Sequence, residues 1–351
     1  MTTVVVFLKG CPTAALGPYG NERVATPALD ALAAGGVVFD AHFATRPEPA
    51  GVLAFRPPPG KPSAVIRHTR PANDSLLEFY AGWGRLFDAR PDPADKSPLD
   101  ALLRVLPDAV RAAAGGLLWV ECDRLTTPWD VPAEVFAEYI EDVLEDDEEY
   151  GEPIRPWADP PAGWFDSDDL ASWELLHRTL AAAVTTFDAD LGHLFGRLRE
   201  LLPDATLVLT ADHGFPLGEH DVVGRFRPYL HEELVHLPLI VRSPQGEGGR
   251  RVAGLTAPED VAAWLAGGVG IGPLLRGEVE AIREQVVSRL PGEAAVRTAD
   301  WAYLHPLATD PDDDPRGPML FRKPADRAEV LNVVGEHGEV AEGLFQVISS
   351  G

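Results

Sequence analysis

The chain has 351 residues, of which 45% are hydrophobic, and its formal net charge is -25. This length and composition predict a globular protein with a sizeable core, and no stretch is apolar enough to predict a membrane span. The 30 basic residues face 55 acidic ones, which excludes nucleic acid as a partner because phosphate backbones attract basic surfaces.

The N-terminal part of the chain predicts alternating strands and helices. Val4 to Leu8 is a first apolar strand, and a turn follows at residues 16–20. Thr26 and Pro27 begin a helix, since threonine can cap the first turn and proline fits its first position. The next strand is expected from Val37 to Phe43.

The middle of the chain predicts further elements of the same kind. A helix is expected from Asp100 to Ala114 and an apolar strand from Leu117 to Cys122. The acidic run at residues 138–152 is typical of a solvated loop. A long helix follows, with Ser167 as its N-cap and an apolar stripe at helical spacing that continues to Leu198.

The C-terminal part predicts short elements. A helix is expected around Ala262 to Leu265, and a final helix from about Glu336 to Val347. Three short strands are expected between them, at residues 295–298, 301–305 and 319–322.

Asp212 and His213 follow an apolar run of strand length, from Leu207 to Thr210. Ligands of open α/β sheets collect at the carboxyl ends of the strands. A carboxylate offers a hard oxygen and an imidazole offers a nitrogen, so the pair predicts a site for a divalent cation.

The residues after this pair form a longer pattern. It runs Asp212-His213-Gly214, Leu217-Gly218-Glu219-His220, Gly224-Arg225, Glu232-Glu233 and Pro238-Leu239-Ile240-Val241. In order and spacing it resembles the DHG, LGEH, GK, EE and PLIV elements of the sulfatase family, in the alkaline phosphatase superfamily. Residues 127–132 are similar to a loop of phosphonate-ester hydrolase-like sulfatases, so the chain resembles a degenerate member of the bacterial arylsulfatase and phosphonate monoester hydrolase type.

The resemblance implies an alkaline-phosphatase-like fold, a three-layer α/β/α sandwich with a mostly parallel central sheet. We expect this domain to span residues 1–255, with strands or substrate loops trimmed around residues 45–115. Residues 256–351 are expected to form a small C-terminal α+β subdomain with short antiparallel strands and a terminal helix.

Lys9 and Gly10 occupy the positions at which the family carries an Asp-Asp metal pair, at the end of the first strand. No carboxylate occurs among residues 1–21, although hard divalent cations require several anionic oxygens. The resemblance therefore implies that Asp212 and His213 are the remnant of a metal site.

Two further features of the family are missing. The motif whose Cys or Ser becomes formylglycine falls on residues 44–51, where Thr45 is the only hydroxyl. Thr45 is either a candidate nucleophile or an ordinary loop residue. The histidine of the family's HEPW loop falls on Thr126.

Two other residues are candidates for contact with a substrate. Arg225 replaces the family's substrate-binding lysine and keeps a planar cation suited to sulfate or phosphate. His220 is a candidate catalytic residue.

An ammonium at a former metal position is compatible with leftover carboxylates. We therefore hypothesise that Lys9 pairs with Asp212, because a buried charge without a partner costs several kcal/mol. The alternative is that Lys9 points to solvent.

Three interpretations of function stay open. The favoured one is a pseudoenzyme that keeps the sulfatase fold for binding or assembly. The second is an active metal-dependent hydrolase of sulfuric or phosphoric esters that uses Asp212 and His213 with His220 or Thr45. The third is a structural partner of an active paralogue.

The expected cofactors and partners follow from these interpretations. We expect no cofactor, or else one divalent cation, calcium or manganese. The expected partners are a small sulfate or phosphate ester or a protein, and neither nucleic acid nor membrane. Two cysteines far apart in the sequence and the lack of an export signal predict a reducing cytoplasm without a disulfide.

Overall fold

The largest element of the computed structural model is an eight-stranded sheet with strand order β10-β2-β9-β7-β1-β5-β3-β4. The structure describes residues 1–68, 74–95, 97–140, 154–225, 229–244, 246, 248–307 and 317–350. From residue 141 onward, the acidic run that we predict as a loop lies outside these ranges.

Seven strands of the large sheet share one direction. The eight strands of the sheet are β1 (Thr3–Leu8), β2 (Val37–Phe39), β3 (Ser63–Arg67), β4 (Arg85–Asp88), β5 (Leu117–Cys122), β7 (Thr206–Ala211), β9 (Leu239–Arg242) and β10 (Arg250–Val252). β9 is the exception, since it pairs antiparallel with β2 and β7. The carboxyl ends of β1, β5 and β7 therefore meet at one edge of the sheet, and the predicted mostly parallel sheet is confirmed.

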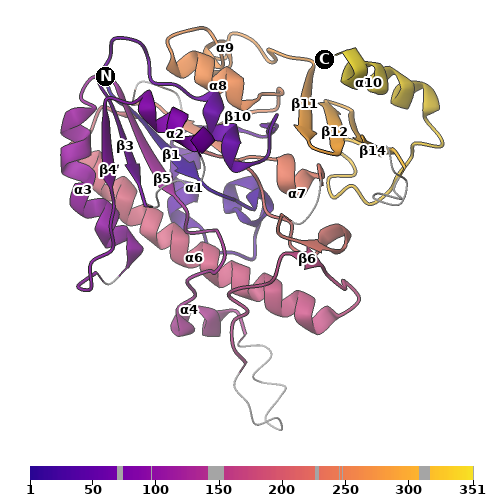
Figure 1. Cartoon of the computed structure of the whole chain (residues 1–351), viewed down its shortest axis with the longest axis horizontal. Helices are drawn as coiled ribbons and strands as arrows, with labels where there is room; N and C mark the ends of the chain where they lie inside the picture. Colours follow the sequence, from indigo (N-terminus) through magenta and orange to yellow (C-terminus); the bar gives the residue numbers. More distant parts are fainter. Residues whose placement is uncertain are drawn as a thin grey trace.

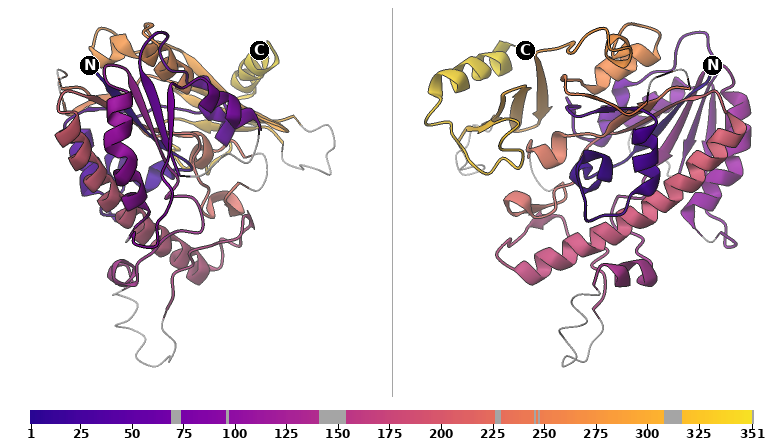
Figure 2. Two further views of the ribbon diagram at one scale, coloured as in Figure 1. Left: turned by 60° about the vertical axis from the view of Figure 1, so that its left-hand side comes forward. Right: turned by 180° about the vertical axis from the view of Figure 1, so that it is seen from behind.

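Helices cover both faces of this sheet, which gives three layers (Figures 1 and 2). One face carries α1 (Pro27–Ala34), α3 (Pro98–Ala112) and α6 (Leu170–Leu201), and the other carries η3 (Pro49–Ala54), α2 (Asp74–Ala81), α8 (Pro258–Leu265) and α9 (Gly272–Leu275). β1 shows why both faces are covered: Val4 and Val6 belong to the core under α1, α3 and α6, whereas Val5 and Phe7 belong to the core under α2, α8 and α9. Each such buried side chain contributes about 1.5–3 kcal/mol.

The long helix α6 runs across one whole face of the sheet (Figure 2). The predicted apolar stripe is buried, including Leu180, Phe187 and Leu194. The predicted N-cap is wrong, because Asp169 and not Ser167 precedes the helix and accepts a hydrogen bond from the Ser172 amide. The Ser167 hydroxyl instead donates to Asp221.

A second, separate sheet lies near the C-terminus. It is an antiparallel sheet of β11 (Gln285–Leu290), β12 (Glu293–Thr298), β13 (Trp301–Pro306) and β14 (Met319–Arg322), with α10 (Gly338–Ser350) packed on one face. Three of these strands and the final helix are predicted from the sequence, whereas β11 is not. The proposed domain division at residue 255 stays a prediction, and the packing of α8 and α9 on the large sheet favours a later boundary.

Short elements complete the chain. They are η1 (Thr13–Ala15), η2 (Gly17–Tyr19), α4 (Ala133–Glu138), η4 (Glu219–Asp221), α7 (Glu232–Val235) and a two-stranded sheet of β6 (Gly163–Trp164) and β8 (Val222–Val223). Residues 45–115 contribute β3 and β4 to the large sheet, and the trimming that we expect there stays a prediction. No helix within the described ranges is both long and apolar enough to cross a membrane.

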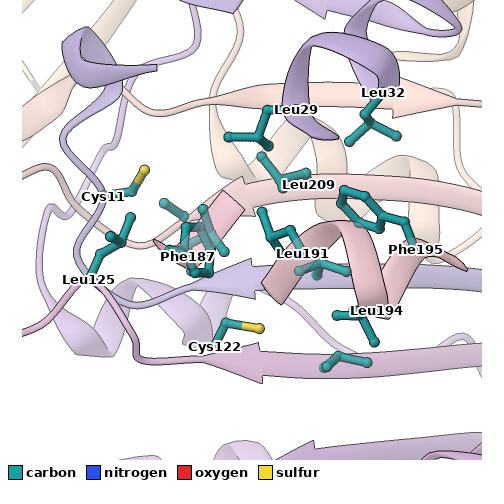
Figure 3. Close-up of a cluster of buried hydrophobic side chains, with 14 of the residues drawn as sticks. Cys11, Leu29, Leu32, Cys122, Leu125, Phe187, Leu191, Leu194, Phe195 and Leu209 are labelled. Carbon is teal, nitrogen blue, oxygen red and sulfur yellow. The ribbon is translucent and has the colours of Figure 1, made fainter. Parts of the chain in front are cut away.

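Both cysteines are free thiols inside the core between the large sheet and α6 (Figure 3). Figure 3 shows Cys11 beside Leu125 and Cys122 below Leu191 and Leu194. Burial raises the pKa of both thiols.

Candidate functional site

Three strand ends bring the predicted remnant of the metal site together. β1 leads into Lys9 and Gly10, its neighbour β7 leads into Asp212 and His213, and β5 lies on the other side of β1. The Gly10 amide donates to Asp212 Oδ1 at 2.9 Å, so a position at which the resemblance implies a metal ligand is in direct contact with Asp212. Gly10 and Asp212 therefore lie side by side at this edge, and their role as a former metal site stays a prediction.

Asp212 already serves as an acceptor for backbone amides. Its Oδ1 atom accepts from the amides of Gly10 and His213, the latter at 2.8 Å, and its side chain is 2% exposed. His213 Nδ1 lies 2.7 Å from the Gly214 carbonyl, to which it donates because a carbonyl can only accept. The other nitrogen, Nε2, lies 3.7 Å from Asp212 Oδ1 and would be the one to hold a cation.

The predicted pairing of Lys9 with Asp212 is wrong. Lys9 Nζ instead forms an ion pair with Glu121 Oε2 at 2.8 Å, and the Glu121 side chain is 3% exposed. The Tyr80 hydroxyl approaches both oxygens of Glu121, at 2.8 and 2.9 Å. Burial raises the pKa of Glu121, and the nearby Lys9 ammonium opposes this rise more than any other group does, so Lys9 is the main stabiliser of the charged carboxylate.

Glu121 is a residue of this site that the sequence interpretation missed. The signal was present, because Glu121 is the one charged residue in the otherwise apolar strand β5, Leu117–Cys122. A carboxylate inside a buried strand needs a partner, and β1 pairs with β5 in a register that sets Phe7 opposite Glu121. Lys9 follows two residues later, and its long side chain reaches that carboxylate.

Gly10 has a left-handed backbone conformation, which glycine adopts more readily than residues with a side chain. Its φ is +66°, and a Cβ atom there would approach His213 Cε1 to 3.1 Å. Lys9 places a cation at the neighbouring position. These two residues do not fit a divalent metal at this edge, because they supply no anionic oxygen and one positive charge.

Thr126, at the position of the missing histidine, also lies here. A Cβ atom on Gly10 would be 3.7 Å from Thr126 Cγ2. The Thr126 hydroxyl donates to the Asp123 carbonyl at 2.6 Å, so it is engaged within its own loop.

The Thr45 hydroxyl is directed to another part of the molecule. It donates to Glu259 Oε1, in the first turn of α8, at 2.5 Å. The segment after it does reach the site, since a Cβ atom on Gly51 would be 3.7 Å from the Asp212 carbonyl oxygen. The hydrogen bond favours the interpretation of Thr45 as a loop residue.

Arg225 and His220 do not contact Asp212 in the structure. Arg225 is exposed and makes no hydrogen bond or ion pair with any other residue in the described part of the chain. His220 lies in η4 and contacts the Tyr229 hydroxyl at 2.8 Å and the Glu329 carbonyl at 3.0 Å. It belongs to a group of charged side chains where α7 meets the C-terminal sheet.

We call this group the junction cluster; it comprises His220, His231, Glu232, Glu233, Arg297, Lys323 and Glu329. Figure 1 shows α7 between the two sheets. Glu329 receives Arg297 at 2.7 Å, His231 at 2.8 Å and Lys323 at 3.0 Å. Glu232 receives Lys323 at 2.8 Å and Arg297 at 3.2 Å.

Two glutamates of the junction cluster, Glu233 in α7 and Glu329, differ in their electrostatics. Burial raises the pKa of Glu233 well above its usual range, and the charges of Glu219 and Glu329 raise it further. For Glu329, burial alone would raise the pKa, but Arg297 and His231 outweigh that effect and lower it. The basic residues thus stabilise the Glu329 carboxylate and leave Glu233 without comparable support.

Two cavities flank the junction cluster. One, of about 330 Å³, is lined by Glu219, Glu233, His177 and residues of η1. The other, of about 490 Å³, is lined by four basic side chains, Arg251, Arg297, Lys323 and Arg327, with Asp40 and Glu232 among them.

Comparison with known proteins finds similarity to sulfatases over part of the sequence. The sulfatase family model matches residues 129–271. An uncharacterised sulfatase of Escherichia coli, YidJ, is 26% identical over 151 residues, which are 40% of this chain and 29% of that protein. An N-acetylglucosamine-6-O-sulfatase of Bacteroides thetaiotaomicron is 36% identical over 81 residues, which are 22% of this chain and 14% of that protein. The matched part is therefore less than a third of either relative.

Solved structures extend the likeness to the whole fold. The phosphonate monoester hydrolase of Agrobacterium radiobacter superimposes with a TM-score of 0.71 and 17% identity, covering 99% of this chain and 95% of that one. Members of the sulfatase family are metal-dependent. Residues 129–271 are therefore similar in sequence to the sulfatase family, and the three-layer fold with its separate antiparallel sheet is similar to that of the phosphonate monoester hydrolase.

Proposed function

We propose that the chain is a non-catalytic sulfatase-like protein that keeps the fold for binding, with a small sulfate or phosphate ester or another protein as its partner. The observation that carries this proposal is the ion pair between Lys9 and Glu121. It lies at the end of β1, where the resemblance places two metal-binding carboxylates.

The ion pair opposes metal binding in two ways. The ammonium repels a divalent cation at the edge where Asp212 and His213 remain. The carboxylate of Glu121 is already bound by Lys9 and Tyr80, so it is not available as a metal ligand. Displacing Lys9 would leave a buried charge without its partner, at a cost of several kcal/mol.

The remaining chemistry supports the same proposal. Thr45 is the only hydroxyl in residues 44–51, and it is bonded to Glu259. The hydroxyl of Thr126 is bonded to Asp123 and cannot replace an imidazole as a proton donor at neutral pH. Arg225 is exposed, which suits contact with an anion without turnover.

The test combines metal analysis with hydrolysis assays on the purified full chain. We expect no turnover of aryl sulfate or aryl phosphate esters with calcium or manganese above that of the Asp212→Ala variant. Stoichiometric calcium or manganese binding, with turnover that Asp212→Ala abolishes, would overturn the proposal and favour an altered hydrolase.

A second arm of the test asks whether the site can be rebuilt. The Lys9→Asp, Gly10→Asp double variant restores the two carboxylates that the resemblance implies. If the site is a remnant, this variant gains calcium affinity over wild type, and an exposed control such as Arg322→Asp does not. Equal affinity in all three proteins would count against a former metal site at this edge.

A further inference from the structure

A group of metal-binding side chains lies outside the remnant site. One donor atom each from His220, His231 and Glu233 lie within 4.8 Å of one another. They come from η4 and from the beginning of α7, and Glu233 Oε1 lies 3.7 Å from His220 Nδ1. Two imidazoles and one carboxylate are a ligand set that zinc uses in proteins, usually with water in the fourth position.

Glu329 orients both imidazoles for this role. The Glu329 carbonyl lies 3.0 Å from His220 Nε2 and can only accept, so Nε2 carries a proton and, in the neutral ring, Nδ1 carries the lone pair. Glu329 Oε2 lies 2.8 Å from His231 Nδ1, which leaves the lone pair of a neutral His231 on Nε2. A carboxylate or carbonyl behind each ligating histidine is the arrangement that fixes tautomer and ring orientation in metal sites.

The position of Glu329 is itself held firmly. Its side chain is fully buried, and Arg297 and Lys323 bind its other oxygen, Oε1. Its φ is +56°, a left-handed conformation that is unfavourable for glutamate. Backbone strain of this kind persists where the surrounding contacts determine the conformation.

One oxygen of the Glu233 carboxylate has no hydrogen-bond partner among the described residues. Its side chain is 11% exposed, and its Oε2 atom is buried without a hydrogen-bond partner among the residues that the structure describes. Buried carboxylate oxygens are normally satisfied, so this atom indicates a missing cation or donor. Glu233 also lines the cavity of about 330 Å³, which gives the site room for an ion and water.

Binding requires a small rearrangement. The rings of His220 and His231 are stacked, with centroids 3.9 Å apart and planes at 22°, so they must turn toward a shared point. The Tyr229 hydroxyl, 2.8 Å from His220 Nδ1, must yield its place. Donor atoms at 2.0–2.1 Å from one zinc ion lie about 3.3 Å apart, which the Glu233 side chain can approach by rotation.

We propose that His220, His231 and Glu233 bind one zinc ion, with Glu329 as the residue that positions both histidines. The site differs in chemistry from the remnant at Asp212, because calcium and magnesium prefer oxygen ligands whereas imidazoles favour zinc. It does not depend on whether the chain hydrolyses esters.

The experiment is a titration of the metal-free full chain with zinc, followed by calorimetry and by elemental analysis after gel filtration. We expect one zinc ion per chain in the wild type, and at least tenfold weaker binding in His231→Gln and Glu233→Gln. His193→Gln, which changes an exposed histidine of α6, is the matched control and keeps wild-type affinity. Asp212→Ala also keeps it, which separates this site from the remnant.

Two further readings guard against variants that fold poorly. Cobalt added to the wild type should give the strong visible absorption of four-coordinate nitrogen and oxygen ligation, and Glu233→Gln should weaken it. Zinc should raise the Tm of the wild type and of His193→Gln but not that of Glu233→Gln. Stoichiometric zinc that survives both His231→Gln and Glu233→Gln, or binding no stronger in wild type than in those variants, would overturn the proposal.

Discussion

The carboxyl edge of the large sheet and the junction cluster treat buried charge in opposite ways. At the edge, one ion pair between Lys9 and Glu121 and two backbone amides on Asp212 satisfy the charged groups in place. In the junction cluster, Arg297 and Lys323 each contact two glutamates, and Glu233 remains unsupported nearby.

The two regions also differ in their place along the sequence. The family model begins at residue 129, after Lys9, Gly10, Thr45 and Thr126, and it includes Asp212 and α7. Apart from Arg225, the positions that lack the residues expected from the resemblance precede the matched segment.

The largest expected effect comes from removing a basic residue of the junction cluster. Arg297→Met leaves Lys323 as the cation that contacts both Glu329 and Glu232, so we expect the free energy of unfolding to fall by about 3–5 kcal/mol. Urea titration measures this. Arg322→Met, which changes an exposed arginine over the Trp301 ring, should cost less than about 1 kcal/mol. Equal losses would contradict the distinction.

A smaller effect is expected from pH. Burial lowers the pKa of His236 to about 4 from 6.5, with Glu232 opposing and Arg327 and Arg297 supporting the shift. Because the unfolded state binds the extra proton, stability is complete above about pH 6.5 and falls as the pH drops through 4, by up to about 3 kcal/mol.

Urea titrations from pH 7 to pH 4 test this dependence. His236→Gln should lose stability at pH 7 and show a shallower decline with acid. His193→Gln should keep the slope of the wild type, and an unchanged slope in His236→Gln would remove His236 as the cause.

The edge of the sheet should respond more weakly. Lys9→Met leaves Glu121 buried with only Tyr80, but Lys9 is 24% exposed, so we expect a loss of about 2 kcal/mol. Adding Glu121→Gln should recover most of it, because the double variant holds no unpaired charge. Additive losses in the double-mutant cycle would show that the ion pair is not the source of the effect.

The smallest effect is expected at Thr45. Thr45→Ala removes one partly exposed hydrogen bond to Glu259, so the free energy of unfolding should fall by about 0.5–1 kcal/mol. The matched variant Glu259→Gln keeps an acceptor and should cost less. A rate of ester hydrolysis that disappears with Thr45→Ala would restore Thr45 as a nucleophile.

The sequence predicts the parts of this molecule that depend on local pattern. The strand at Leu207 to Thr210, the stripe of α6 and the strands Met319–Arg322 and Trp301–Pro306 follow from periodicity and are confirmed. The contact between Gly10 and Asp212 also follows from the pattern, because each residue comes just after one of two parallel strands, β1 and β7.

Contacts between distant segments are beyond such reasoning. Lys9 pairs with Glu121 and not with Asp212, because two backbone amides already satisfy Asp212. The spacing of these residues in the sequence does not reveal this. Glu329 reaches His231 across 98 residues through the fold of the C-terminal sheet. The observed N-cap of α6, Asp169, lies two residues after the predicted one, because the hydroxyl of Ser167 bonds to Asp221 instead.

The two buried thiols give the core a built-in reporter of its opening. Cys11 and Cys122 lie on the α6 side of the large sheet, Cys11 in the loop after β1 and Cys122 at the end of β5, and burial raises the pKa of each. A thiol that is both protonated and shielded reacts with alkylating reagents only when its surroundings unfold. The rate at which each cysteine is labelled in the native protein therefore measures how often α6 separates from the sheet, without any engineered probe.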